Sequence, residues 1–368
     1  MKAKAIWIVG LVALAAGYCV SRPDSARIAY ISSDSTLAEL VATPAPPRAV
    51  WATPLLVTPA RSAIIGRGDA RDVASAEAAV AAPGVVVVVG HASSRGSLLA
   101  APIYGEAGVP FIAPTATSRR LRDAGPWTFQ LAPDDEAEGA FIARYALDSL
   151  GARRITIYYL VADEYGIGLK NGIARALAAR GGAPADEVGI LDDSDFELRV
   201  AGSLRRAIPD AIVIAARTPE AVAIARALRA RRVPAPLILA DGVDGGGFAR
   251  DAGSSAARAY GVAWWDPESP DSASRSFIER FRRIAGRAPR QQEAMYYDAL
   301  MLAAQAAHEA GGSRDGIRRW LSALGAERAP YRGITGPISF APGRATNLVM
   351  LRLDVAPGAA GPHAASGR

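Results

Sequence analysis

The chain has 368 residues, of which 50% are hydrophobic and 21% are charged, a balance typical of globular domains and not of disordered chains. At this length the chain can form two domains, each with a substantial core. The formal net charge is +6, but only three lysines occur and the arginines alternate with acids, so the sequence argues against a basic patch for nucleic acid.

Residues 1–18 are typical of an export signal. Two lysines precede the apolar run AIWIVGLVALAAGY, which is too short for a stable membrane span. Cys19, the only cysteine, follows directly, and the arrangement resembles a bacterial lipoprotein signal in which this cysteine is acylated. Tyr18 departs from that pattern, because a small residue is usual there. Simple cleavage after the A-x-A of Ala13 and Ala15 is the alternative, but the position of the single cysteine favours acylation.

Short apolar strands alternate with longer helical segments along most of the remaining chain. This alternation predicts βαβ units and parallel sheets, and the continuous apolar strands indicate sheets covered on both faces. The expected strands lie at 27–32, 85–89, 109–114, 153–161, 186–191, 210–216, 236–241, 259–265 and 345–355. The expected helices between them lie at 69–82, 95–108, 167–181, 196–208 and 218–232.

Two changes of composition suggest joins between the halves of the chain. In FQLAPDDEAEGAF, Asp135 and Glu138 form a helix start signal close to a capping box. WWDPESPDS is rich in proline, aspartate and serine and precedes further helices. The tail at 357–368 is small and polar, and we expect it to be disordered.

The valine strand at 85–89 ends in GHASSRGS, in which Ser94 lies in A-x-S-x-G, a variant of the nucleophile elbow of α/β-hydrolases. A hydrolase also needs a histidine base oriented by an acid. His308 is expected inside a helix, His363 in the tail, and His91 precedes the serine by only three residues, so no convincing triad can be assembled. Hydroxyls beside a helix start at the end of a parallel strand suit a bound carboxylate, although a serine there is also an ordinary N-cap. The residues favour binding over hydrolysis.

The segment VVVVVGHASSRGSLLAAPIYGEAGVPFIAPTATS resembles the signature of the type 1 periplasmic binding proteins, specifically their leucine/isoleucine/valine-binding group. The resemblance continues through FQLAPDDEAEGAFIARYALDSLGARRITIYY, ADEYGIGLKNGIARAL and YRGITGPISF, and it covers about residues 70–354. It implies an α/β fold of two doubly wound parallel-sheet lobes that trap a ligand as they close. Three crossings would join the lobes, near Leu131, Asp266 and Gly333.

These crossings divide the chain between the two lobes. Lobe 1 is expected to comprise residues 27–131 and 266–333, and lobe 2 residues 132–265 and 334–356. In the family a long helix separates the first two strands. Here prolines interrupt the stretch from Ser32 to Pro59, so we expect this helix to be reduced or absent.

The resemblance also implies the residues that contact a ligand. The hydroxyls of Ser94, Thr115 and Thr117, with nearby backbone amides, would hold the carboxylate of an amino acid. Tyr165 would form an aromatic wall from the second lobe, and Asp241 would pair with the α-ammonium group. Each residue also has an ordinary structural interpretation, as a turn residue, a core aromatic or a cap.

Arg217 stands at a position where the family often has an aromatic residue. If its guanidinium faces the cleft, the ligand should bring its own acceptor, because an unpaired buried cation is costly. If it pairs with Glu220 on the same expected helix, the pocket could stay apolar and suit leucine-like ligands. We expect the first case, and with it a polar or acidic ligand.

The sequence therefore predicts an exported solute-binding protein that captures an amino acid or a close analogue for an ABC importer, with the permease as its membrane partner. It indicates the periplasm or the outer face of a bacterial membrane, with attachment only through a lipid on Cys19. No catalysis, cofactor, metal or nucleic acid is expected. The alternatives are a sensing or scaffolding envelope lipoprotein that has lost transport, and a serine hydrolase that uses Ser94.

Overall fold

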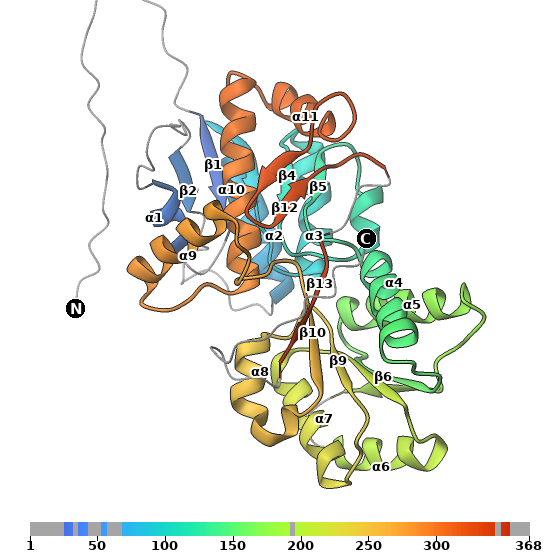
Figure 1. Ribbon diagram of the computed structural model, residues 1–368. Helices are drawn as coiled ribbons and strands as arrows, with labels where there is room; N and C mark the ends of the chain where they lie inside the picture. Colours follow the sequence, from blue (N-terminus) through green and yellow to red (C-terminus); the bar gives the residue numbers. More distant parts are fainter. Residues whose placement is uncertain are drawn as a thin grey trace, which may run out of the picture.

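The computed structural model describes residues 26–31, 36–42, 53–56, 68–191, 196–342 and 347–353. They form two lobes, one above the other in Figure 1, each built on its own sheet. The export signal, Cys19 and the tail at 357–368 lie outside the described residues.

Lobe 1 contains a five-stranded parallel sheet in the order β2-β1-β3-β4-β5. Its strands are β1 (Arg27–Tyr30), β2 (Thr53–Leu56), β3 (Val85–Val89), β4 (Phe111–Ala113) and β5 (Thr128–Gln130). Its helices are α1 (Thr36–Ala42), α2 (Gly68–Ala81), α3 (Ser94–Glu106), α9 (Ser272–Ala285), α10 (Gln291–Glu309) and α11 (Arg314–Ser322). A short hairpin, β11 (Tyr331–Gly333) with β12 (Gly336–Ile338), packs beside them.

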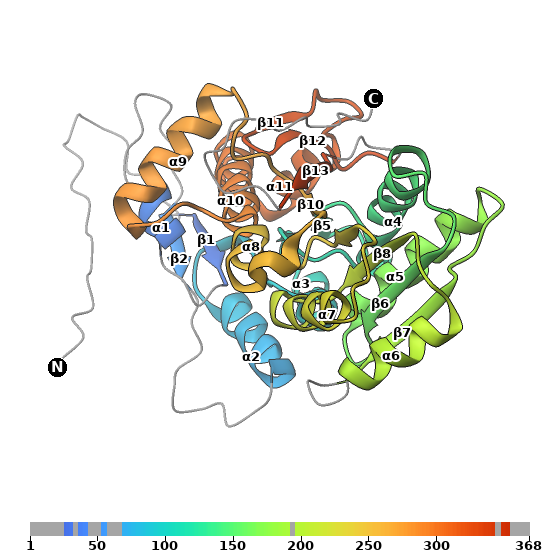
Figure 2. The ribbon, with the colours of Figure 1, turned by 60° about the horizontal axis from the view of Figure 1, so that its bottom comes forward.

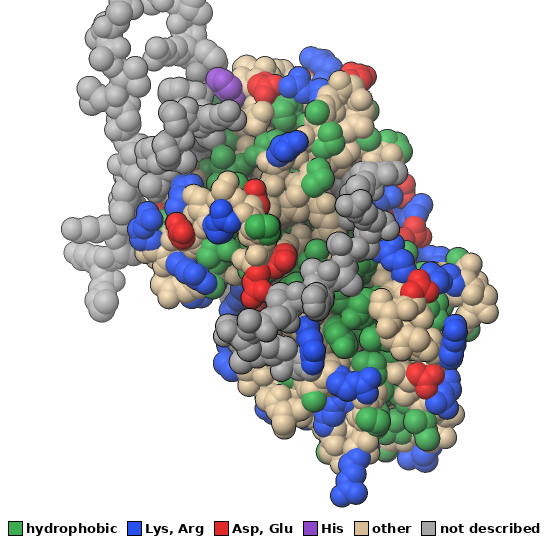
Figure 3. Space-filling model, viewed as in Figure 1, with side chains coloured by type: hydrophobic (Ala, Val, Ile, Leu, Met, Phe, Trp, Pro, Cys, Tyr) green, Lys and Arg blue, Asp and Glu red, His purple; other side chains and the backbone are tan. Residues whose placement is uncertain are grey.

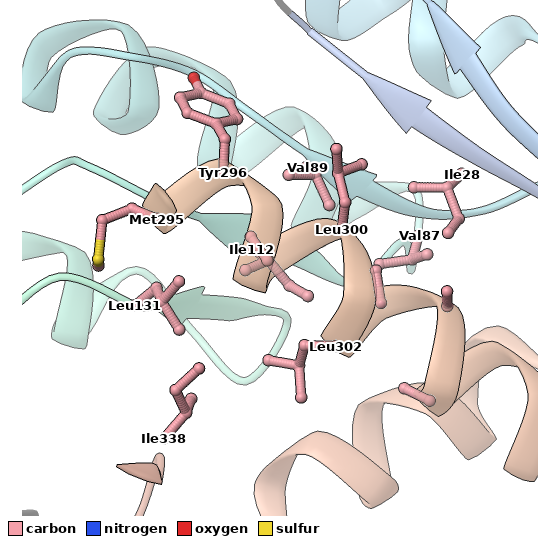
Figure 4. Packing of buried hydrophobic residues seen from close by; sticks show 14 of the residues in the cluster. Ile28, Val87, Val89, Ile112, Leu131, Met295, Tyr296, Leu300, Leu302 and Ile338 are labelled. Carbon is pink, nitrogen blue, oxygen red and sulfur yellow. The ribbon is translucent and has the colours of Figure 1, made fainter. Parts of the chain in front are cut away.

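Both faces of the lobe 1 sheet are covered, which explains the unbroken run of five valines in β3. On one face α2 and α3 pack against Val88, and on the other α10 packs against Val87 and Val89. Figure 4 shows Leu300 of α10 among these valines and Ile28 of β1. A side chain that points to either face of β3 is therefore buried.

Lobe 2 contains a six-stranded sheet in the order β13-β10-β9-β8-β6-β7, in which only β13 is antiparallel to its neighbour. Its strands are β6 (Ile155–Leu160), β7 (Asp186–Ile190), β8 (Ala211–Ala215), β9 (Leu237–Leu239), β10 (Ala259–Ala263) and β13 (Val349–Arg352). The helices α4 (Asp135–Arg144) and α5 (Glu164–Ala178) cover one face. The other face is covered by α6 (Phe196–Arg206), α7 (Thr218–Ala230) and α8 (Gly245–Ala252).

The chain passes between the lobes three times. It leaves lobe 1 after β5, and it returns after β10, since Trp264 and Trp265 already pack in the lobe 1 core. The third passage lies later than the predicted Gly333, because Ile338 and Phe340 also pack in that core. The segment GITGPISF folds back as the β11–β12 hairpin, so it stays with lobe 1 and the chain enters lobe 2 only at β13.

The stretch between β1 and β2 contains one described helix, the seven-residue α1. This helix is short, not missing, and its Leu37 and Leu40 are buried in the lobe 1 core beside α9. Both ribbon views show α9 next to α1 at the edge of the lobe (Figures 1 and 2).

On the face drawn in Figure 3, lysine and arginine side chains are spread over both lobes and do not form one basic patch. Among the residues that the structure describes, no helix is both long and apolar enough to cross a membrane.

The helices α4 and α5 pack unusually close together because Gly139 of α4 lies against Gly172 of α5. A Cβ atom added to Gly139 would lie 2.4 Å from the carbonyl carbon of Gly172. One added to Gly172 would lie 2.2 Å from the carbonyl oxygen of Asp135. Two helices can approach this closely only without side chains at the contact, and the approach holds the first turn of α4 against α5.

Gly139→Ala should therefore force α4 and α5 apart and lower the free energy of unfolding by about 1–3 kcal/mol, as overpacking does. Gly105→Ala in α3 is the matched control, since a Cβ added there meets nothing within 4 Å. It should be neutral or stabilising by up to about 1 kcal/mol, because alanine has the higher helix propensity. Urea denaturation followed by circular dichroism measures both, and equal effects of the two substitutions would contradict the close-packing explanation.

Candidate functional site

A small cavity of about 40 Å³ lies between the lobes, beyond the carboxyl ends of strands from both sheets. Its wall includes all six residues predicted from the sequence to contact a ligand: Ser94, Thr115, Thr117, Tyr165, Arg217 and Asp241. It also includes residues that sequence reasoning did not single out, among them Gly242, Trp264 and Gln292. Residues more than 140 positions apart in the chain thus meet at one site.

The lobe 1 side of the cavity is organised by two serines at the start of α3. Ser93 caps the helix, and its hydroxyl accepts a hydrogen bond of 3.0 Å from the N–H of Gly96. The hydroxyl oxygen of Ser94 accepts bonds from the backbone N–H groups of Thr117 and Ser118, at 3.2 and 3.1 Å. These bonds tie the helix start to the loop after β4, and they leave the proton of the Ser94 hydroxyl for another acceptor.

The two threonines behave differently from each other. The Thr115 hydroxyl donates to the carbonyl oxygen of Ala92 at 3.0 Å and so stabilises the turn before α3. The Thr117 hydroxyl is buried and has no hydrogen-bond partner of ordinary geometry among the described residues. A buried hydroxyl in the wall of a cavity is suited to a ligand or a water molecule.

On the lobe 2 side, the Tyr165 hydroxyl donates to Oδ1 of Asp241 at 2.6 Å and accepts a bond from the N–H of Gly242 at 2.9 Å. Asp163 caps α5 and holds Tyr165 in the first helical turn. Tyr165 also packs in the lobe 2 core, so it is both a core residue and part of the cavity wall. These bonds fix Asp241, which follows β9 directly, at the cavity, and only 2% of its surface is exposed.

Arg217 lines the cavity but pairs with Asp163, not with Glu220. Its guanidinium donates to Oδ2 of Asp163 at 2.7 and 3.3 Å, and it lies over the Tyr165 ring, 5.0 Å from the ring centre. Sequence spacing suggested Glu220 because it is three positions away on the same helix. The actual partner is 54 positions earlier, where only the fold brings it close.

Two further buried carboxyl groups, on Asp135 and Glu138, lie behind Asp241 and do not line the cavity. Oε1 of Glu138 accepts a hydrogen bond of 3.0 Å from the backbone N–H of Asp241. Burial raises the pKa of the Asp135 carboxyl to about 8, although the nearby Thr117 hydroxyl opposes the shift. Burial and the neighbouring Asp241 also raise the pKa of Glu138 well above its ordinary value. Neither α4 acid was predicted as part of the site, because acids are common in any first helical turn.

The lobes are also joined directly at the cavity by Gln291 of α10. Its side-chain amide donates to the carbonyl oxygen of Asp241 at 2.7 Å, and its carbonyl oxygen accepts from the N–H of Trp264 at 3.0 Å. Gln291 therefore joins lobe 1 to the main chain of Asp241 in lobe 2.

The geometry gives no support to a catalytic role for Ser94. His91 is buried, with Nδ1 2.8 Å from Asp72 and Nε2 3.0 Å from the Tyr104 hydroxyl. Both of its ring nitrogens thus face partners other than Ser94, whose oxygen already accepts two amide bonds. Among the described residues, no group of three or more histidines, cysteines or acids is arranged to hold a metal ion.

A family model described as periplasmic binding protein matches residues 68–354 of the chain. The chain belongs to the periplasmic binding protein family. This confirms the resemblance stated on the sequence motifs. The family and the neighbouring structures are substrate-binding proteins and not enzymes, so this protein has a solute-binding role in an extracytoplasmic family.

Individual members of the family are similar over most of this chain. Leu/Ile/Val-binding protein homolog 1 of Brucella abortus is 28% identical over 262 residues, which are 71% of this chain and 69% of that protein. A substrate-binding protein of Desulfitobacterium hafniense in complex with Leu is 25% identical, with a TM-score of 0.70 over 89% of this chain and 96% of that one. The branched-chain amino acid transporter substrate-binding protein LivJ of Streptococcus pneumoniae, in complex with isoleucine, has a TM-score of 0.74 at 21% identity, over 90% and 97%. The predicted type 1 fold of this periplasmic binding protein is confirmed.

The burial of Asp135 predicts a dependence of stability on pH. Its pKa lies near 8 in the folded protein and near 3.8 in the unfolded chain, so between these values the folded state binds one more proton. The contribution of Asp135 to the free energy of unfolding should then fall by about 1.4 kcal/mol for each pH unit between about pH 4 and 8.

Asp135→Asn replaces the titrating carboxyl group with a neutral amide, so this dependence on pH should disappear. Urea denaturation from pH 4.5 to 8 should show the variant gaining on the wild type as pH rises, with the smallest difference at the acidic end. Parallel stability curves of wild type and variant would show that Asp135 titrates normally.

Proposed function

We propose that this periplasmic binding protein captures an α-amino acid or a close analogue between its lobes and delivers it to an ABC importer. The observation that carries the proposal is the polarity of the cavity. Hydroxyl and amide donors line its lobe 1 side, and one carboxylate, Asp241, lines its lobe 2 side. A zwitterion has the complementary arrangement. Two of the similar structures are complexes with isoleucine and with Leu, which are amino acids too.

The lobe 1 side suits the carboxylate of the ligand. Ser94 has its proton left to donate, and Thr117 offers a buried hydroxyl that makes no hydrogen bond of ordinary geometry among the described residues. Ser94 is the first residue of α3 and accepts a bond from the backbone N–H of Thr117 in the loop after β4. Backbone N–H groups at a helix start favour negative charge. No cation is needed on this side to bind an anionic group.

The lobe 2 side suits the ammonium group. The Asp241 carboxylate accepts one bond from the Tyr165 hydroxyl and keeps further acceptor sites towards the cavity. A charge-assisted bond from an ammonium group to such a buried carboxylate is among the stronger hydrogen bonds that a ligand can make.

The side chain of the ligand would meet Arg217, the Tyr165 ring and Trp264. Asp163 takes only part of the five donors of the Arg217 guanidinium. The indole N–H of Trp264 is buried without a hydrogen-bond partner among the described residues. These donors favour a ligand side chain that carries an acceptor, such as an amide or a carboxylate, over a purely apolar one.

Calorimetry with L-leucine, L-glutamine and L-glutamate tests both ends of the site. Asp241→Asn should weaken binding of any of them by about 10–100-fold, because the ammonium group loses its charged partner. Arg217→Tyr should shift the preference from the polar ligands towards leucine. Arg250→Tyr, an exposed arginine on α8 that pairs with Asp251, is the matched control and should change nothing. Tight leucine binding by wild type that is unchanged in Arg217→Tyr would show that Arg217 takes no part.

We further propose that the mature chain begins at an acylated Cys19 and is anchored to the outer face of a bacterial membrane. The support is the charged leader that ends at the single cysteine. Intact-mass measurement of detergent-extracted protein should show a diacylglyceryl adduct on Cys19, and Cys19→Ser should release the protein into the soluble fraction. A mature wild-type chain that begins at Ala16 and carries an unmodified Cys19 would support ordinary cleavage after Ala15.

A further inference from the structure

Glu138 is fully buried beside Asp241, yet it does not line the cavity. Oε1 of Glu138 accepts the backbone N–H of Asp241 across a separation of 103 positions. Its other oxygen, Oε2, is buried and receives no bond from an N–H or hydroxyl donor of the described residues. Because Glu138 bonds to the main chain of Asp241 and both residues are buried, their two carboxyl groups are neighbours in one water-poor place. Burial and the neighbouring Asp241 raise the pKa of Glu138 well above its ordinary value. Two carboxyl groups so placed need a proton between them.

The surroundings decide which of the two acids keeps that proton. Asp241 faces the Tyr165 hydroxyl of α5, the Arg217 guanidinium that precedes α7, and the cavity. Glu138 faces Asp241, the buried Asp135 of its own helix and the neutral Tyr165. Within the described part of the chain, no lysine or arginine pairs with Glu138. The negative charge is therefore favoured on Asp241 and the proton on Glu138.

We propose that Glu138 carries a proton at neutral pH and donates a hydrogen bond from Oε2 to the Asp241 carboxylate, as a positioning residue for the ligand's ammonium group. The link to the ammonium group rests on the proposed function, whereas the proton itself does not. Glu138 would then bond to Asp241 twice, through Oε1 to its backbone N–H and through Oε2 to its side chain. Both the main chain and the carboxylate of Asp241 would be held in place. The pair then carries one negative charge, enough for one ammonium group.

Glutamine has the same shape as a protonated glutamate and the same pattern of one acceptor and one donor. Glu138→Gln should therefore keep both bonds, and Glu138→Leu should remove both at similar volume. In calorimetry with L-leucine, L-glutamine and L-glutamate, Glu138→Gln should bind within about threefold of wild type, and Glu138→Leu at least about tenfold more weakly. Equal loss of affinity in both variants, or none in Glu138→Leu, would overturn the positioning role.

Infrared spectroscopy of the ligand-free protein tests the proton independently. The difference spectrum between wild type and Glu138→Gln at pH 7 should contain the C=O band of one protonated carboxyl group, which survives in Asp135→Asn. An ionised-carboxylate band in its place would overturn the proposal, even if Glu138→Leu does not fold. If wild type binds none of the three amino acids, the proposed ligand class is wrong, while the infrared result still decides whether Glu138 holds a proton.

Discussion

The site depends on one electrostatic constraint, which is that a carboxylate buried between two lobes needs compensation from its surroundings. Asp241 is compensated by the Tyr165 hydroxyl, while its backbone groups bond to Glu138 on α4 and to Gln291 on α10. No arginine or lysine among the described residues forms a direct ion pair with it, and Arg217 acts only at longer range. A salt bridge within the protein would neutralise Asp241. Neutral donors stabilise the charge and leave it available to a cation in the cleft.

The close packing of α4 on α5 is what allows this arrangement. Gly139 and Gly172 let the two helices approach until the first turn of α4 lies against α5 and the end of β9. Only at that distance can Glu138 reach the backbone of Asp241, while Tyr165 reaches its side chain from the other helix. Two glycines in the interior of helices cost helix propensity. Here they bring Glu138 of α4 and Tyr165 of α5 to the same residue, Asp241, which follows β9.

Much of this architecture could be predicted from the sequence, because its signals are local. The continuous valine strand indicated a sheet covered on both faces, and the serines after it indicated a helix start at the strand end, as Ser93 and Ser94 show. The six residues that the family resemblance implied do meet at one cavity, and their roles towards a ligand stay predictions. What could not be predicted is set by contacts distant in sequence. Arg217 found its partner 54 positions away, and the hairpin at GITGPISF kept the chain in lobe 1 past Gly333.

On the proposed function, closure of the cleft and recognition of the ligand would be coupled through shared residues. Gln291 of lobe 1 bonds to the carbonyl oxygen of Asp241 and to the backbone of Trp264, where the chain crosses between the lobes. If the lobes separate, the bond from Gln291 to the carbonyl oxygen of Asp241 breaks, and the donors around Ser94 move away from Asp241. A ligand favours the closed form only by the extra contacts that it makes there. A molecule with a carboxylate alone could bind to lobe 1 in either form, so it would gain little from closure. On the proposed function, a zwitterion would reach both Ser94 and Asp241 only when the lobes are together, and its two charges would supply the difference in affinity that closes the cleft.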